Sequence, residues 1–283
     1  MDFVLIDGNE FFAIEGYGDF LVIKSEKIEY YTDLINSKSI KNIGINAYWG
    51  YGLDDFRFLS KCPKIEKIYI VGDDYDLTDL NHLRCLTFIS TTSNADKLDF
   101  SNFPHLEYCC INWSKKVLNL EKSKEITHLK IYKYKAFEDI AALPFFNHLS
   151  ILEIIDSSIS SLKGIERYTS LVDFRGYYLS KLTNINAIAK AEELRFFILE
   201  NCKRVFDYQC LEENKHLRKI ILSNCGDIKS IKFIQELKEL VFFTFMGSNV
   251  LDGDMMPCIR LQYFAFNNRK HYSHTDKEIK ALG

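Results

Sequence analysis

The chain has 283 residues, of which 47% are hydrophobic and 27% are charged, and it contains four prolines. This composition excludes a disordered, collagen-like or low-complexity chain and is sufficient for one large domain or two ordinary ones. The net charge of −3 lacks the basic excess that sequence-independent phosphate binding requires, so we expect no nucleic-acid partner.

The start of the chain has no basic segment followed by a long apolar run, so it predicts no secretion signal. No stretch reaches the roughly 18 apolar residues of a membrane helix, and we expect no membrane association. The eight cysteines include no CxxC pair, which favours reduced thiols over a disulfide scaffold. Together these features predict a cytoplasmic protein.

Residues 1–38 have the pattern of a small β/α cap. The apolar runs Phe3–Ile6 and Phe11–Ile14 flank Asp7-Gly8, a hairpin signal, and Phe20–Ile23 can add a third strand. A helix is predicted next, because the following apolar residues share one helical face: Ile28, Tyr31, Leu34 and Ile35.

Residues 39–270 repeat. In the segment Leu149-Ser-Ile-Leu152-Glu-Ile154, apolar residues occupy positions 1, 4 and 6 of a unit, and the same spacing recurs along the chain. The mean interval is about 22 residues. We place the first positions of the units at Ile40, Ile65, Leu83, Leu106, Ile126, Leu149, Leu171, Leu194, Leu217, Leu240 and Leu261.

This pattern resembles the leucine-rich repeat family, in its bacterial, internalin-like style of short repeats. The family motif L-x-x-L-x-L-x-x-N is represented by Leu194-x-x-Phe197-x-Leu199-x-x-Cys202 and by the next unit, Leu217-x-x-Ile220-x-Leu222-x-x-Cys225. The ninth position is polar or Cys at Thr91, Ser114, Ser157, Cys202, Cys225 and Ser248. It departs from the family pattern at Tyr48, Tyr134, Leu179 and Arg269.

The resemblance implies an α/β fold, a right-handed horseshoe-shaped solenoid with a parallel sheet on its concave side. Positions 4 and 6 of each strand face the core, and positions 3, 5 and 7 face the concave side. On the convex side, the pattern predicts helices in Ile185–Glu193 and Ser230–Glu239 and a 3₁₀ turn in Ile159–Tyr168.

Residues 271–283 form a predicted C-terminal tail or cap. Thr275 and Glu278 have the spacing of a capping box, and Ile279 and Leu282 follow, which predicts a short helix. No Pro-, Gly- or Ser-rich stretch separates the repeats, so we expect one continuous domain.

No catalytic constellation, cofactor site or metal site is predicted. Four histidines directly precede unit starts and are explained by the repeat: His82, His105, His148 and His216. Cys85 and Cys110 are assigned to concave positions, without an adjacent histidine that could activate a thiol. We therefore expect neither an enzyme nor a small-molecule substrate.

The concave positions instead carry aromatic residues and charges of both signs, which are enriched at protein interfaces. The alternative is that these side chains only pack into ladders along the sheet. The predicted partner-binding residues are Tyr108, Trp113, Lys130, Tyr132, Glu153, Asp156, Asp173, Arg175, Tyr177 and Phe196.

The sequence thus favours a non-catalytic module that binds a protein on its concave face. By analogy with the family, a more specific hypothesis is an immunity or antitoxin-like protein that masks a toxin. The alternative is a secreted effector or adhesion-type repeat protein that binds a host surface protein, because specialised export does not require a cleavable signal.

Overall fold

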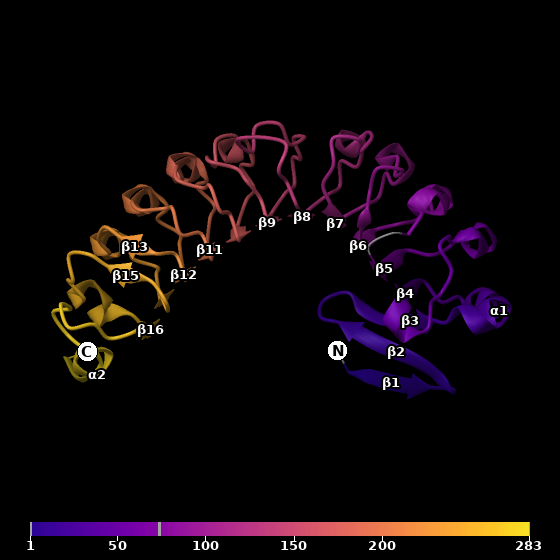
Figure 1. The fold of residues 1–283 in the computed structure, drawn as a ribbon, viewed down its shortest axis with the longest axis horizontal. Helices are drawn as coiled ribbons and strands as arrows, with labels where there is room; N and C mark the ends of the chain where they lie inside the picture. The colour runs from indigo at the N-terminus through magenta and orange to yellow at the C-terminus, as the bar shows by residue number, and fades with distance from the viewer. Residues whose placement is uncertain (1, 73–74, 283) are drawn as a thin grey trace. The chain divides into compact units, whose positions relative to one another are not determined.

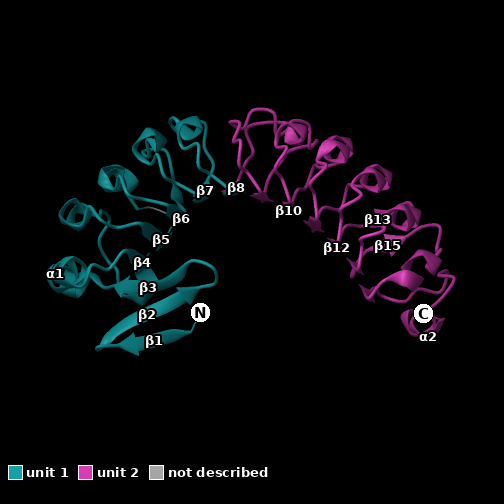
Figure 2. Ribbon diagram, turned by 180° about the vertical axis from the view of Figure 1, so that it is seen from behind, with its two compact units in different colours: residues 1–129 teal, residues 130–283 magenta. Residues whose placement is uncertain are grey.

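The computed structural model describes residues 2–72 and 75–282. The chain divides into two compact units, residues 1–129 and 130–283 (Figure 2). In each unit, parallel strands lie side by side along one face, and short 3₁₀ helices lie along the opposite face (Figure 1). We call the strand surface that is turned away from these helices the sheet face.

The first unit begins with the three strands and the helix that the sequence predicts for residues 1–38. An antiparallel hairpin and a third strand lead into helix α1 (Ile28–Lys38), and the third strand then pairs in parallel with the first repeat strand. The strands in spatial order are β1 (Phe3–Ile6), β2 (Asn9–Ile14), β3 (Gly18–Ile23), β4 (Asn42–Asn46), β5 (Lys67–Val71), β6 (Phe88–Asn94) and β7 (Tyr108–Asn112). The 3₁₀ helices are η1 (Ser25–Lys27), η2 (Ala47–Trp49), η3 (Arg57–Lys61), η4 (Leu77–His82), η5 (Phe100–Asn102) and η6 (Leu120–Lys122).

The second unit continues the same construction; the boundary between the units falls inside β8 (His128–Tyr132). The further strands in spatial order are β9 (Ile151–Ile155), β10 (Asp173–Tyr177), β11 (Phe196–Glu200), β12 (Lys219–Ser223), β14 (Phe242–Thr244) and β16 (Tyr263–Ala265). A separate two-stranded sheet joins β13 (Asp227–Ile228) to β15 (Asn249–Val250). The helices are η7 (Ile165–Arg167), η8 (Asn186–Lys190), η9 (Gln209–Glu213), η10 (Lys232–Glu236), η11 (Met256–Arg260) and α2 (Asp276–Leu282).

The strands confirm the predicted register except in one unit. Each begins two residues after its predicted first position, as β10 does after Leu171. The assignment of Leu83 was wrong, because β6 begins at Phe88 and the unit therefore starts at Leu86. Consequently, Thr91 lies inside the strand rather than at a ninth position, and Cys85 is exposed in the preceding turn rather than on the sheet face.

The core follows the predicted alternation. Positions 4 and 6 are fully buried, for example Phe197 and Leu199 in β11. At the ninth position, the Cys225 thiol donates to the carbonyls of Leu199 and Ser223, and the Ser248 hydroxyl donates to Leu222. These polar groups satisfy backbone carbonyls between successive coils, as the family motif implies.

A row of backbone hydrogen bonds, which we call the left-handed ladder, runs along the ends of the strands in the second unit. The eighth residue of five successive repeats has a left-handed backbone, with φ between 51° and 58°, and its N–H donates to a carbonyl of the following repeat at 2.8–2.9 Å. The donors are Lys133, Asp156, Tyr178, Asn201 and Asn224.

The helix side differs from prediction in one respect. The segments Ile185–Glu193 and Ser230–Glu239 hold only the five-residue 3₁₀ helices η8 and η10. Their buried residues recur every three positions, as at Ile231, Ile234 and Leu237, which is the period of a 3₁₀ helix. The C-terminal helix is confirmed. The Glu278 carboxylate accepts from the Thr275 N–H at 2.7 Å, as a capping box requires.

Candidate functional site

Most of the predicted partner-binding residues lie on the sheet face of the second unit, on the adjacent strands β8 to β11. Parallel pairing places Arg175 directly beside Glu153 on one side and Ile198 on the other. Tyr177 is paired in the same way with Ile155 and Glu200. Since neighbouring strands are about 4.8 Å apart, side chains of equal position form continuous rows across the strands.

An ion network occupies the centre of this surface. The Arg175 guanidinium donates to the Asp173 carboxylate, with Nη2 at 2.6 Å and Nε at 3.1 Å from its oxygens. Its Nη1 atom lies 4.0 Å from Glu153 Oε1, and Lys130 Nζ lies 3.4 Å from Glu153 Oε2. We call these four residues, Lys130, Glu153, Asp173 and Arg175, the charge network.

The two carboxylates of the charge network are almost inaccessible. The Glu153 and Asp173 side chains are 7% and 8% exposed, whereas Arg175 is 35% exposed. The hydrogen bonds to Asp173, together with the charge of Glu153, raise the pKa of the Arg175 guanidinium above its ordinary value. Two cations and two anions neutralise one another, so this surface has no surplus positive charge for a phosphate.

Aromatic side chains border the charge network. Lys130 Nζ lies 5.7 Å from the centre of the Tyr132 ring. Tyr177 and Phe196 are half-buried, and burial raises the pKa of the Tyr177 phenol. These rings have apolar faces near solvent beside fixed charges, a combination typical of anchoring residues at protein interfaces.

Asp156 stands apart from the charge network. It follows β9 with a left-handed backbone, and its carboxylate pairs with Lys135 at 2.8 Å while both side chains remain about half exposed. The structure therefore places Asp156 at the ends of the strands rather than within the rows of the sheet face.

Tyr108 and Trp113 belong to the first unit, where Tyr108 is held in an aromatic cluster. Its ring stacks on Phe88 at 4.3 Å and contacts Tyr17 and His128 edge-on at 5.0 and 4.6 Å. Trp113 is half-buried just after β7.

Tyr17 reaches this cluster because the turn between β2 and β3 extends over the sheet face, as Figure 1 shows for the loop beside β3. The Tyr17 hydroxyl is 3.3 Å from His128 Nδ1, and Lys67 Nζ donates to the Tyr17 carbonyl at 2.6 Å. The repeat pattern did not predict this coverage, because a hairpin turn lies outside the repeats.

One feature of the sequence, a glycine in a repeat strand, is consistent with the hairpin covering the sheet face of the first unit. Gly44 occupies a sheet-face position where the other repeats carry side chains, and a Cβ atom there would clash with the Phe12 ring. The missing side chain makes room for Phe12, which packs with Phe20, Val22 and Phe88.

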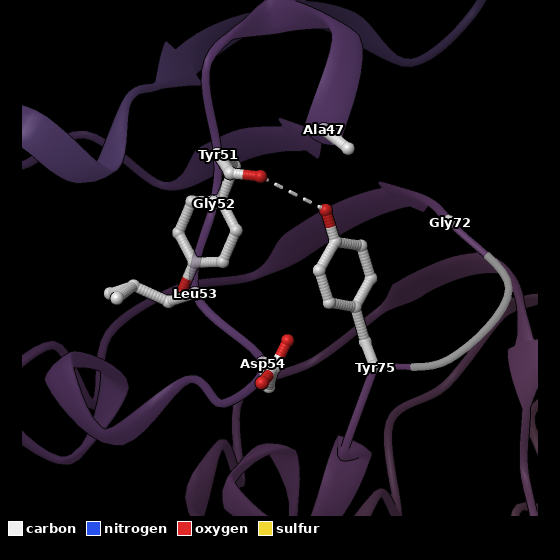
Figure 3. A pocket seen from close by; sticks show the side chains of 7 residues that line it. All are labelled: Ala47, Tyr51, Gly52, Leu53, Asp54, Gly72 and Tyr75. Atoms are coloured by element: carbon white, nitrogen blue, oxygen red, sulfur yellow. Dashed lines mark hydrogen bonds between the residues drawn. The ribbon is translucent and has the colours of Figure 1, made fainter.

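A separate cavity of about 270 Å³ lies at the ends of β4 and β5 (Figure 3). Its lining includes two tyrosines, and the Tyr75 hydroxyl donates to the Tyr51 carbonyl at 3.3 Å. Burial is the main cause that raises the pKa of both phenols, which keeps both hydroxyls protonated at neutral pH. Within residues 2–72 and 75–282, no three metal-ligating side chains converge on one point. No helix in that part of the chain is long and apolar enough to cross a membrane.

Comparison with known proteins identifies the fold. No family model and no curated protein matches the sequence. Among solved structures, an internalin (InlF) from Listeria monocytogenes is similar at a TM-score of 0.65 and 14% identity, over 90% of this chain and 76% of that one. The structure of a TLR13–ssRNA13 complex is similar at 0.54 and 15% identity, over 77% of this chain but only 35% of that chain. The chain therefore has the leucine-rich repeat fold, as its sequence predicted.

Proposed function

We propose that the chain is a non-catalytic module that binds a protein partner on the sheet face of its second unit. The observation that carries the proposal is the neutral charge network bordered by the aromatic rings of Tyr132, Tyr177 and Phe196. Fixed, internally compensated charges orient a partner through complementary hydrogen bonds, while the rings supply the apolar contact area. The first-unit residues Tyr108 and Trp113 remain proposed contacts.

Phosphate-rich ligands fit this surface less well. Both cations of the charge network already serve carboxylates, and an incoming phosphate would be repelled by the two acids. A protein partner can match both signs of charge.

The more specific proposal is an immunity or antitoxin-like protein that masks a toxin. It predicts that the gene next to the one for this chain encodes a toxin, for example a nuclease. Co-expression of the two should restore growth that the toxin alone stops, and the two proteins should copurify. Growth arrest despite full expression of this chain would reject that pairing.

The sheet-face contact is tested with the copurified partner. Tyr177→Ala should weaken binding about tenfold or more, because truncation of a central anchor costs about 2 kcal/mol. Phe196→Ala tests the border of the same surface. Lys238→Glu, exposed beyond η10 on the helix side, is the matched control and should leave the affinity unchanged. Equal affinities in all three variants, with unchanged circular dichroism, would refute the proposed surface.

A further inference from the structure

Strand β1 is an open edge of the first unit. It is the last strand of its sheet and pairs only with β2 in the part of the chain that the structure describes (Figure 1). Its four apolar side chains, Phe3, Val4, Leu5 and Ile6, are 44%, 59%, 71% and 45% exposed. Such an edge presents unpaired backbone groups that can template another strand.

The hairpin turn determines which backbone groups point outward. Asp7 and Gly8 have φ values of 50° and 78°, as in a two-residue type I′ turn. In such a hairpin, the flanking pair Ile6–Asn9 is hydrogen-bonded, and bonded and non-bonded pairs alternate from there. Phe3 and Leu5 therefore direct their N–H and C=O groups away from β2, toward the free edge.

Strand β1 makes packing contacts on one face and borders a groove on the other. On the sheet face, the Phe3 ring packs edge-on against Trp49 at 5.3 Å. On the α1 side, a groove of about 350 Å³ runs beside the hairpin, lined in part by Ile6, Phe11, Tyr30 and Leu34. An added strand would extend the sheet and place alternate side chains toward this groove, whose lining also includes Asp7, Asn9 and Lys38.

The charged residues around β1 indicate which charges an added strand should carry. Residues 2–23 contain five acids and no Lys, Arg or His; Lys24 pairs with Glu10 at 2.8 Å, and Lys38 is the one cation that lines the α1-side groove. Asp2 and Asp7 bracket the strand. An antiparallel second copy would bring Asp2 of one chain toward Asp7 of the other, which like-charge repulsion opposes.

We propose that β1 accepts an added β-strand from a protein partner, an apolar segment flanked on both sides by basic residues. This surface is distinct from the sheet face of the second unit, and the inference does not rest on the proposed function. Backbone hydrogen bonds supply the pairing, and the acidic residues supply the preference for basic flanks.

The test uses the full chain and two synthetic peptides, Lys-Lys-Val-Thr-Val-Thr-Val-Lys-Lys and its counterpart with Glu in place of every Lys. The Lys-flanked peptide should bind and protect the Phe3 and Leu5 amides from hydrogen exchange. The affinity of the Glu-flanked peptide should be lower by about tenfold or more. Equal binding of the two peptides, or no binding of the Lys-flanked peptide, would overturn the proposal.

Variants separate backbone pairing from side-chain contact. Leu5→Pro removes an outward N–H, which an edge strand tolerates, and should reduce Lys-flanked peptide binding about tenfold. Leu5→Thr keeps the donor and is the matched control.

A charge variant tests the acidic residues. Asp2→Lys leaves the strand intact and should lower the affinity for the Lys-flanked peptide while it raises the affinity for the Glu-flanked one. Unchanged peptide affinity in both Leu5→Pro and Asp2→Lys would contradict the edge assignment. A dimer in sedimentation that Leu5→Pro dissociates would instead assign the edge to a second copy.

Discussion

The guanidinium of Arg175 holds two nearly inaccessible carboxylates in place, so it stabilises the fold as well as forming part of a surface. Arg175→Glu would set three acids together, and we expect a loss of about 1–3 kcal/mol in the free energy of unfolding. This is less than for a fully buried pair, because Arg175 is about one-third exposed.

Thermal unfolding measures this loss. Addition of Glu153→Gln to the Arg175→Glu variant should recover part of the lost stability, because it removes one of the repelling charges. A melting temperature equal to that of the natural chain would show that the charge network contributes nothing to folding.

Tyr178 is strained where Asn201 and Asn224 are not, although all three occupy the same place in successive repeats. A left-handed backbone costs most residues about 1–2 kcal/mol but suits Asn. Tyr178 has φ of 55° and is 56% exposed, so Tyr178→Asn should stabilise the protein by about 0.5–1 kcal/mol. Tyr48→Asn, at an exposed residue without a left-handed backbone, is the control for loss of a surface ring. A lower melting temperature for Tyr178→Asn alone would contradict this reading of the ladder.

At the scale of elements, the first turn of η4 is stabilised by an aspartate. Asp76 accepts from the Thr78 N–H and pairs with Lys97 at 2.7 Å, and these contacts lower its pKa from 3.8 to about 2. A lowered carboxyl pKa in the folded state stabilises the protein above pH 4, and this contribution is lost as the pH falls toward 2.

Asp76→Asn keeps an N-cap but removes the charge. The melting temperature of the natural chain should exceed that of Asp76→Asn at pH 7, and the difference should shrink between pH 4 and pH 2. A difference that stays constant over this range would show that the carboxylate charge is not the stabilising feature.

The strands were predictable because each repeat places apolar residues at positions 1, 4 and 6, which only one strand register buries. The error at Leu83 has a physical origin. Leu77, Leu80, Leu83 and Leu86 recur every three residues through η4 and its following turn, and all four are buried, so spacing alone could not identify the first position.

For the candidate site, the sequence predicts which face of the sheet each side chain occupies but not which side chains contact one another. Alternation along the strand assigns Arg175 and Tyr177 to the sheet face, but it does not show that Arg175 holds Asp173 and approaches Glu153. Nor does it show that Tyr17 covers Tyr108, because that contact depends on how far a hairpin turn extends.

At the scale of the whole molecule, the repeat spacing continues through residue 129 without a Pro-, Gly- or Ser-rich linker. We therefore propose one continuous domain, with residues 1–38 as cap, residues 39–270 as repeats and residues 271–283 as tail. Limited proteolysis should give no pair of independently stable fragments. Two folded fragments produced by cleavage between Leu106 and Leu194 would contradict a single domain.

Thiol reactivity provides a second measurement on the whole chain. All eight cysteines carry free thiols, and only Cys85 is exposed. Burial raises the pKa of Cys202 and Cys210 to about 12 and that of Cys225 to about 11, which suppresses the reactive thiolate. A thiol reagent should label one site quickly in the native protein and eight after denaturation, and Cys85→Ser should abolish the fast phase. A persistent deficit of two in the denatured protein would indicate a disulfide.

The left-handed ladder also determines where the chain can change its length. From the first position of a repeat to its left-handed residue there are always seven steps, as from Leu149 to Asp156 and from Leu217 to Asn224. In the second unit, differences in repeat length therefore fall in the returning half, on the helix side, whereas in the first unit β6 itself carries a register shift between Ser90 and Asn94. A peptide inserted in the returning half should be tolerated, whereas deletion of one residue from a strand would turn core side chains toward the sheet face and disrupt the hydrogen bonds to the next repeat.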